Sequence, residues 1–280
     1  MIVLLVIQSL MAEKNQNLAG RRATIQRQLL LDGIVDVETL AQDLGVSLVT
    51  IRRDLTALEN EGSIRRTHGG ATATTSRGAD QAFALREQID SEAKRQIAHA
   101  AFELVETDQA LFMNDGSTVL ALAKELVAWD LNLTVATPGV NIATTLSENP
   151  GIDAYLAGGL VRHRTLGTTG DFVEQMLAVI NADIAFIAAE GVSAEEGVTF
   201  SYEADAKIAR IMNRKATKTV VLATTRKLGE RDRITAIPVS AIDILVTDCD
   251  DETKLSGFRK LGILIIVTAN HETHVVNTPA

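Results

Sequence analysis

Cysteine is nearly absent from the 280-residue chain, which has only Cys249. A single cysteine excludes an internal disulfide framework and is typical of a protein kept in a reducing compartment. Cys249 follows an apolar run, so we expect it to pack rather than to react. The apolar stretch Ile2–Ile7 is much too short to span a bilayer. We therefore expect a cytoplasmic protein with no membrane partner.

Other common signals are also missing. Ile2–Ile7 lacks the basic flank and small-residue cleavage site of a signal peptide, and Met11 is an equally good start. There is no internal repeat at solenoid periods. His271 and His274 lie close together, but in a tail from about residue 270 that we expect to be loose. We therefore expect no metal site and no other cofactor.

Positive charge is scarce, since the formal net charge is −9. Residues 1–75 contain eight Lys and Arg and eight Asp and Glu, so the acidity belongs entirely to the remainder. A neutral N-terminal part with clustered arginines predicts weak, salt-sensitive DNA binding by one copy. This favours a symmetric homo-oligomer, a dimer or a tetramer, that contacts repeated half-sites.

Apolar residues recur at helical spacing in three consecutive segments, near 20–31, 37–44 and 48–61. Asp36 is placed to cap the second helix and Ser47 the third, and Gly45 between them tolerates the left-handed backbone that ends a helix. Three amphipathic helices also occur in many small domains. The order of cap, glycine turn, exposed arginine pair and basic hairpin favours a winged helix-turn-helix.

The third helix predicts the DNA-reading surface. Once its apolar side chains turn inward, Ser47, Thr50 and Arg53 share an exposed face, with Arg52 beside them. Arginine bonds bidentately to guanine, and Ser and Thr contact base edges or phosphates. Arg65, Arg66 and His68 precede Gly69-Gly70, a hairpin turn signal, and are expected to meet the DNA backbone.

The second half of the chain alternates apolar strands with helices. Seven strands are expected, after a helix near 85–106: Ala110–Asn114, Leu133–Thr137, Ile152–Ala157, Ile184–Ala188, Thr219–Ala223, Ile242–Thr247 and Ile263–Val267. This pattern predicts a Rossmann-like, mainly parallel sheet covered on both faces. Ligands of such sheets bind beyond the carboxyl ends of the strands.

Polar and glycine-rich loops follow several of these strands. The first holds Asp115, Gly116, Ser117 and Thr118, which would surround an anion at a helix start, although a plain capped turn is the alternative. Three further loops have residues suited to the same ligand. They contribute Gly158, Gly159 and Arg162, then Glu190, and finally Lys227.

These motifs resemble the DeoR family of bacterial regulators, over nearly everything from Arg21 to Val267. The most specific part is Val46–Leu55, followed by Leu58, Glu61-Gly62 and Arg66–Ala71. The resemblance implies a sensor domain related to ribose-phosphate isomerase and glucosamine-phosphate deaminase folds. It also implies an oligomeric repressor of a sugar-catabolism operon that senses a phosphorylated sugar. Asn114, Pro138, Glu190 and Thr224 depart from the family pattern, which suggests an altered ligand.

We therefore expect an α/β protein in five parts: a flexible N-terminus (1–18), a winged helix-turn-helix (19–74), a linker (75–90), an α/β effector-sensing domain (91–270) and a loose tail (271–280). Its expected partners are double-stranded operator DNA, a phosphorylated sugar and further copies of itself. A sugar-phosphate isomerase or deaminase fused to a DNA-binding domain, and a DNA-binding scaffold with a dead pocket, are the alternatives to this non-enzymatic regulator.

Overall fold

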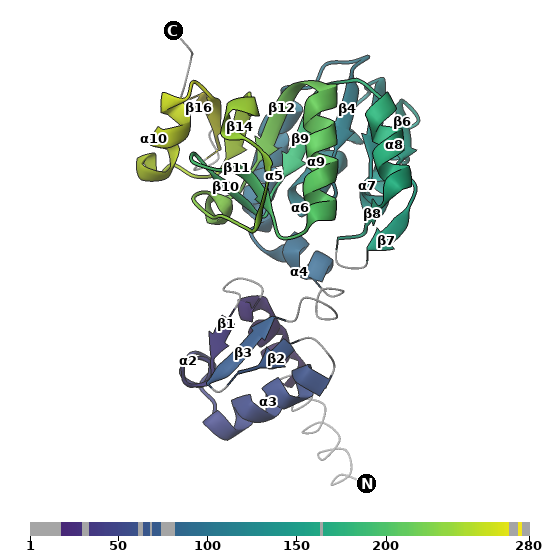
Figure 1. The fold of residues 1–280 in the computed structure, drawn as a ribbon. Helices are drawn as coiled ribbons and strands as arrows, with labels where there is room; N and C mark the ends of the chain where they lie inside the picture. Colours follow the sequence, from purple (N-terminus) through teal and green to yellow (C-terminus); the bar gives the residue numbers. More distant parts are fainter. Residues whose placement is uncertain are drawn as a thin grey trace. The chain divides into compact units, whose positions relative to one another are not determined.

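The computed structural model describes residues 18–29, 34–60, 64–67, 69–73, 82–162, 165–268 and 274–275. The chain divides into two compact units, Met1–Leu85 and Arg86–Ala280. Helix α4 (Ala82–Gln88) crosses the boundary between them (Figure 1). The segment predicted to be a flexible N-terminus lies, except for its last residue, outside the described residues.

The first unit contains the three predicted helices, at residues 18–29, α2 (Val37–Asp43) and α3 (Leu48–Asn60). Asp36 caps α2 by accepting the N–H groups of residues 38 and 39, and Gly45 has the predicted left-handed backbone, with φ 63°. The inward faces of the three helices and the small sheet form one apolar core: Ile25, Leu29, Val35, Val37, Leu40, Ala41, Ile51, Leu55, Leu58, Ile64 and Ala71.

A three-stranded antiparallel sheet completes this unit, in the order β1 (Ile34–Asp36), β3 (Gly70–Ala73), β2 (Ile64–Arg66). The sequence did not predict β1, because three residues carry no periodicity. Gly70, predicted as part of a hairpin turn, instead begins β3. A Cβ atom there would lie 1.8 Å from the carbonyl oxygen of Val35, so the close approach of β1 requires glycine.

The second unit is built on an eight-stranded sheet in the order β16-β15-β14-β12-β9-β4-β5-β6. All neighbouring pairs are parallel except β15 with β16. All seven predicted strands are present: β4 (Ala110–Met113), β5 (Leu133–Thr137), β6 (Ile152–Leu156), β9 (Ala182–Ala188), β12 (Ala216–Leu222), β14 (Ile244–Thr247) and β15 (Leu264–Val267). The predicted mainly parallel α/β fold is therefore confirmed.

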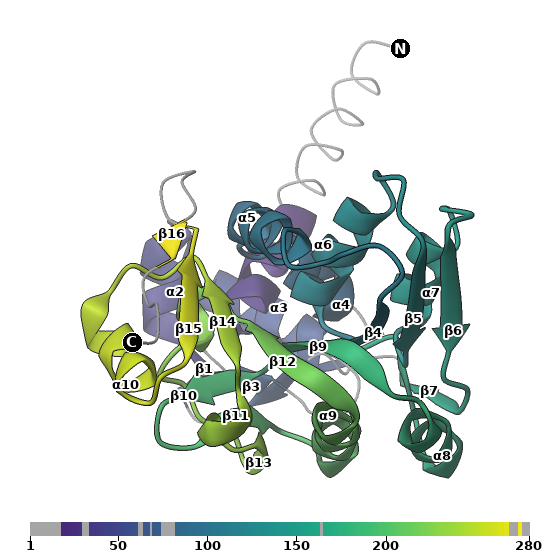
Figure 2. The same ribbon diagram turned by 90° about the horizontal axis from the view of Figure 1, so that it is seen from above.

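Helices cover both faces of the sheet, as Figure 2 shows. On one face α5 (Ser91–Phe102) packs against α6 (Ser117–Leu126), and α6 against α7 (Val140–Leu146). On the other, α8 (Asp171–Val179) packs against α9 (Glu203–Lys215). Helix α10 (Glu252–Lys260) precedes β15. No helix within the described ranges is both long and apolar enough to cross a membrane.

Several short elements differ from expectation. The predicted linker contains α4, and the helix expected near 85–106 is two helices separated at Asp90, whose φ is 52°. In the predicted loose tail, β16 (His274–Val275) pairs with β15. The sequence also missed a hairpin and a small antiparallel sheet, with two 3-10 turns nearby. These are β7 (Leu160–Arg162) with β8 (Gly167–Thr169), then β10 (Gly191–Ser193), β11 (Gly197–Phe200) and β13 (Ile234–Ile237), with η1 (Thr225–Lys227) and η2 (Val239–Ala241).

The strand order reverses between β4 and β9, and a side chain holds these two strands together. From β4 the chain adds β5 and β6 on one side, whereas β9, β12, β14 and β15 follow on the other. Asn114, at the end of β4, donates to the carbonyl oxygen of Ala188 at 2.8 Å and accepts the N–H of Ala188 at 2.9 Å. Asn114 is buried, and its amide bonds to both backbone groups of Ala188. Asn114 therefore has a structural role at this point of the sheet.

Replacing Asn114 with alanine would leave both backbone groups of Ala188 unsatisfied in the interior. We expect Asn114→Ala to lower the free energy of unfolding by about 1–3 kcal/mol. The only tryptophan, Trp129, lies in the second unit, so urea denaturation followed by its fluorescence reports on this change. Asn132→Ala, at an exposed position, should alter stability by no more than about 0.5 kcal/mol. Equal losses in both variants would contradict the role of Asn114.

Candidate DNA-reading and effector-binding sites

The start of α3 is shaped by two hydroxyl groups. The Ser47 hydroxyl accepts the N–H of Thr50 at 3.2 Å, as predicted for a helix cap, and lies 2.9 Å from the Thr50 hydroxyl. Only one of the two hydroxyls donates in this contact, so the other keeps its proton for an acceptor such as a phosphate. Ser47 is exposed and Thr50 half-buried.

The two arginines of α3 are exposed, as predicted. Arg52 and Arg53 lie on the side away from the buried Ile51 and Leu55. The inward face of the same helix also carries Asp54, which is 1% exposed. Its carboxylate accepts from Arg21 at 2.6 Å and from Arg22 at 3.3 Å. Those two arginines are therefore committed to an internal ion pair, whereas Arg52 and Arg53 face solvent.

The hairpin of β2 and β3 is tied to the second half of α3. The backbone N–H of Arg66 donates to Glu59 at 2.9 Å, and its guanidinium donates to the Thr56 hydroxyl at 3.2 Å. The Arg66 side chain remains exposed, with further donors available. Arg65 lies in β2 opposite Thr72. His68 lies outside the described residues.

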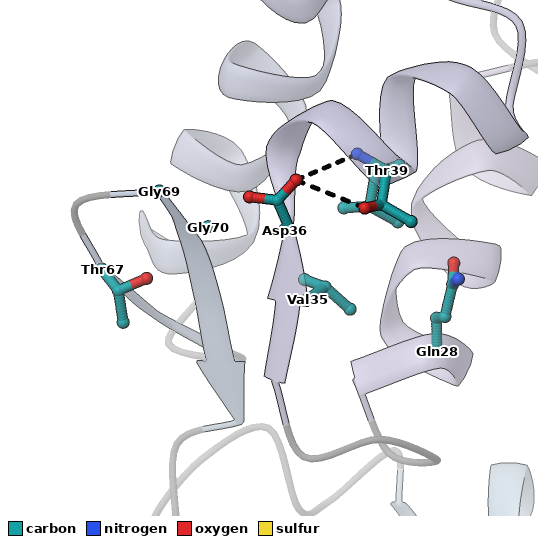
Figure 3. Close-up of a pocket in the computed structure, with 8 residues that line it drawn as sticks. Gln28, Val35, Asp36, Thr39, Thr67, Gly69 and Gly70 are labelled. Atoms are coloured by element: carbon teal, nitrogen blue, oxygen red, sulfur yellow. Dashed lines mark hydrogen bonds between the residues drawn. The ribbon is translucent and has the colours of Figure 1, made fainter.

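A cleft of about 390 Å³ lies beside the start of α2 in this unit (Figure 3). Its charged group is the carboxylate of Asp36, which accepts from the backbone and the hydroxyl of Thr39. These bonds, led by that of the Thr39 backbone, hold the pKa of Asp36 below its ordinary value. A cleft that presents an anion does not suit an anionic ligand. It is lined by Gln28, Val35, Asp36, Thr39, Leu40, Thr67, Gly69 and Gly70.

In the second unit, the loop after β4 lies at the switch point. Gly116 precedes α6 as its cap residue and supplies no side-chain cap. A Cβ atom at Gly116 would lie 2.4 Å from that of Ala188, so glycine allows the loop to rest against β9. Ser117 and Thr118 begin the helix, and their N–H groups have no acceptor within the described part of the chain. These donors and the helix dipole favour an anion here.

The β7–β8 hairpin lies against the loops that follow β4 and β5. A Cβ atom at Gly167 would lie 2.1 Å from the Asp115 carboxylate. The N–H of Thr168 donates to Pro138 at 2.8 Å, and that of Val140 to Leu166 at 2.8 Å. The sequence missed this hairpin, which contacts both Asp115 and the start of α7.

The two glycines after β6 have different roles. A Cβ atom at Gly159 would lie 2.6 Å from the carbonyl oxygen of Thr169 and 2.8 Å from Val173, so packing requires glycine. A Cβ atom at Gly158 would meet no atom within 4 Å. Gly159 therefore shapes the hairpin, and only Gly158 leaves open space.

Arg162 was expected to bind a phosphate, but it already has a carboxylate partner. Its guanidinium donates to the buried Asp205 of α9 and lies 4.8 Å from the centre of the Tyr202 ring. Glu203 and Lys207 of α9 form ion pairs with Arg210 at 2.8 Å and Glu174 at 2.6 Å. The Glu203–Arg210 pair lies within α9, whereas the contacts of Asp205 and Lys207 join α9 to Arg162 and to α8. The sequence showed neither of these two contacts because their partners lie on separate elements.

Glu190 and Lys227 follow β9 and β12, the two neighbouring strands on the other side of the switch point. Glu190 accepts the N–H of Ser201 at 2.5 Å. The half-buried Lys227 ammonium makes no hydrogen bond or ion pair with any described residue. Burial lowers the pKa of Lys227, the charge of Glu190 raises it, and Arg86 and Arg226 lower it further. Lys227 is thus an inward cation without a partner at the predicted ligand edge.

Sequence reasoning missed a second lysine, because its spacing in α5 is that of an ordinary surface residue. Lys94 is buried, and its ammonium donates to the carbonyl oxygens of Arg86 and Ile89. Burial lowers the pKa of Lys94 to about 8, Asp90 raises it, and the charges of Lys227, Arg86 and Arg226 lower it. Arg226 lies 3.6 Å from Asp90. The edge near η1 is therefore rich in positive charge.

The lowered pKa of Lys94 predicts a stability that rises with pH. Between about 8 and 10.5 the unfolded chain binds a proton that the folded chain has released, so raising the pH favours the folded state. We expect the difference in unfolding free energy between the wild type and Lys94→Met to move in favour of the wild type over this range. Urea denaturation at several pH values measures it, with the exposed Lys260→Met as control. A constant difference would show that Lys94 keeps its proton.

Family models match both units. Residues 21–77 match the DeoR-like helix-turn-helix domain, and residues 89–249 match the DeoR C terminal sensor domain. The HTH-type transcriptional regulator GlpR of Haloferax volcanii is 35% identical over 76% of this chain and 82% of its own. The HTH-type transcriptional repressor GlcR of Bacillus subtilis is 34% identical over 85% of this chain and 92% of its own.

Solved structures show weaker similarity. Ribose 5-phosphate isomerase A of Methanocaldococcus jannaschii is 18% identical with a TM-score of 0.37, over 49% of this chain and 54% of that one. Translation initiation factor eIF-2B of Pyrococcus horikoshii is 16% identical with a TM-score of 0.44, over 81% and 87%. Neither similarity carries an inference about activity. The two domain matches and the regulator relatives show the family instead: the chain belongs to the DeoR family of transcriptional regulators.

Proposed function

We propose that this regulator represses a carbohydrate-catabolism operon and is released by a phosphorylated sugar bound at the carboxyl edge of its parallel sheet. The observation that carries the effector site is the unpartnered ammonium of Lys227 beside the strand-order reversal. An inward cation with a lowered pKa is unfavourable until an anion reaches it. A relative in Escherichia coli O157:H7 is named a putative aga operon transcriptional repressor, which supports the assignment as a repressor.

The effector would lie across the end of β9. The uncapped start of α6 follows β4 on one side of β9, and Lys227 follows β12 on the other. Because neighbouring strands are about 4.8 Å apart, the ends of β4 and β12 are about 10 Å apart, so a phosphate bound between them would meet the helix start on one side and the long Lys227 side chain on the other. We assign the phosphate to Gly116, Ser117 and Thr118. Asp115 and Glu190 would accept sugar hydroxyl groups, and Gly158 gives room beside them.

The DNA-reading surface belongs to the first unit. We assign base contacts to Arg52 and Arg53, with the Ser47 and Thr50 hydroxyls beside them. Arg65, Arg66 and His68 would contact phosphates, as the sequence predicts for the wing. The protein would act in the cytoplasm as a homo-oligomer, because a single neutral reader binds DNA weakly.

Release requires only a modest energetic preference. A sugar phosphate that binds one oligomeric arrangement better than the DNA-bound one shifts the population away from the operator. A tenfold loss of operator affinity needs about 1.4 kcal/mol of differential binding. We propose that no turnover accompanies binding, and a direct assay for isomerisation or deamination of the bound sugar phosphate tests this.

Arg53→Ala tests the base-reading assignment. If Arg53 bonds to a guanine, its loss should cost about 1–3 kcal/mol on preferred sequences and relax the preference at one base. Duplexes selected from a randomised pool by the wild type provide the sequences, and gel-shift titration provides the affinities. Arg214→Ala, an exposed arginine of α9, should bind them like the wild type. An Arg53→Ala variant with unchanged strength and preference would refute the role.

Lys227→Met tests the effector site. A sugar phosphate at 100 times its dissociation constant should stabilise the wild type by about 2.7 kcal/mol and weaken its DNA binding. Lys227→Met should lose both responses while binding the selected duplexes normally without effector. Lys218→Met removes an exposed charge at the opposite end of β12 and should respond like the wild type. A normal response by Lys227→Met would remove Lys227 from the site, and a wild type indifferent to all sugar phosphates would overturn the proposal.

A further inference from the structure

The first turn of α3, the proposed recognition helix, has an apolar side chain exposed to solvent. Val49 of α3 is 72% exposed, whereas Ile51, Leu55 and Leu58 of the same helix are buried. Placing a valine in water gains no burial energy within the chain. Val49 therefore adds nothing to the apolar core, and its position on the helix determines what it can contact.

Val49 shares a face with the two exposed arginines. Arg52 and Arg53 follow it by three and four residues, which places all three side chains along one side of α3. The opposite side is fixed in the core by Ile51 and Leu55. Any partner that meets the arginines from outside the unit therefore also meets Val49.

The β2–β3 hairpin lies beside the second half of α3, so the first half is the part that can enter a groove. Arg66 contacts Thr56 and Glu59, so the hairpin flanks the second half of α3. No described residue makes a comparable contact with the side chain of Val49, Arg52 or Arg53. Helix-turn-helix proteins contact base edges through the N-terminal residues of the recognition helix.

The floor of the major groove offers one apolar group, the 5-methyl group of thymine. We propose that Val49 is a specificity-determining residue that packs its isopropyl group on this methyl group in each half-site. The Val49 side chain has no donor or acceptor, so it favours the thymine methyl group over the polar edges of adenine and guanine and over cytosine, which lacks this methyl group. The inference rests on the DNA-reading surface proposed above and adds a contact that needs no hydrogen bond.

The experiment separates the methyl group from every other feature of the base. The full-length wild type selects duplexes from two randomised pools, one synthesised with thymine and one with uracil, which lacks only the 5-methyl group. In the thymine pool we expect thymine to be enriched at one position of each half-site. Since one buried methyl group contributes about 0.8 kcal/mol, the enrichment should fall about three- to fivefold in the uracil pool.

Variants assign the effect to Val49. Val49→Ala removes two methyl groups and should weaken the thymine enrichment in the thymine pool while keeping the guanine positions. Val49→Thr retains one methyl group and should keep part of it. Val179→Ala, a 78% exposed valine of α8, should select like the wild type. Equal enrichment of uracil and thymine by the wild type, or an unchanged preference in Val49→Ala, would overturn the role of Val49. If the wild type selected no sequence at all, the DNA-reading proposal itself would fail.

Discussion

The hydrogen bonds between Asn114 and Ala188 fix the point on which the effector edge depends. They join β4 to β9, where the strand order reverses and where the two outgoing loops separate. Because the amide satisfies both an N–H and a C=O group, the loops can diverge without leaving buried backbone groups unpaired. Gly116 then brings the start of α6 against β9, and the β7–β8 hairpin covers it. Ligands of parallel sheets bind beyond the carboxyl ends of the strands at such a reversal, and the Asn114 amide joins β4 to β9 there.

In the first unit, a buried carboxylate pairs with two of the arginines. Burying Asp54 under Arg21 and Arg22 consumes two positive charges that would otherwise add to the affinity for any DNA. Among the described residues of this unit, the exposed arginines are Arg52 and Arg53 on α3, Arg66 at the wing and Arg27 on the first helix. A reader with few unspecific phosphate contacts depends more on base contacts and on repeated half-sites. The neutral charge balance of residues 1–75 weakens DNA binding by one copy, and this is the physical reason for proposing that an oligomer binds the operator.

Periodicity predicted the three helices of the first unit and the seven strands of the main sheet, because each buries one continuous apolar face. It failed for β1, β7 and β8, whose three residues pair only with strands brought close by the tertiary fold. Glycines predicted as turns or open loops, such as Gly70 and Gly159, instead allow backbone contacts that only the fold creates. The sequence could not show that Arg162 contacts Asp205, because the two lie 43 residues apart. The sequence did not predict the burial of Lys94, because the spacing of residues along a helix does not show that a lysine is buried.

The positive field near η1 favours a working sensor over an inert scaffold. Two lysines with lowered pKa values lie in the fields of Arg86 and Arg226, and each such charge opposes the folded state when no anion is present. Asp90 and Glu190 offset this field only in part. An anion that reached this edge would offset the remaining positive charge, so the charge arrangement favours an anionic effector. Lys227 supports this more strongly than Lys94, because the Lys94 ammonium already donates to two carbonyl oxygens.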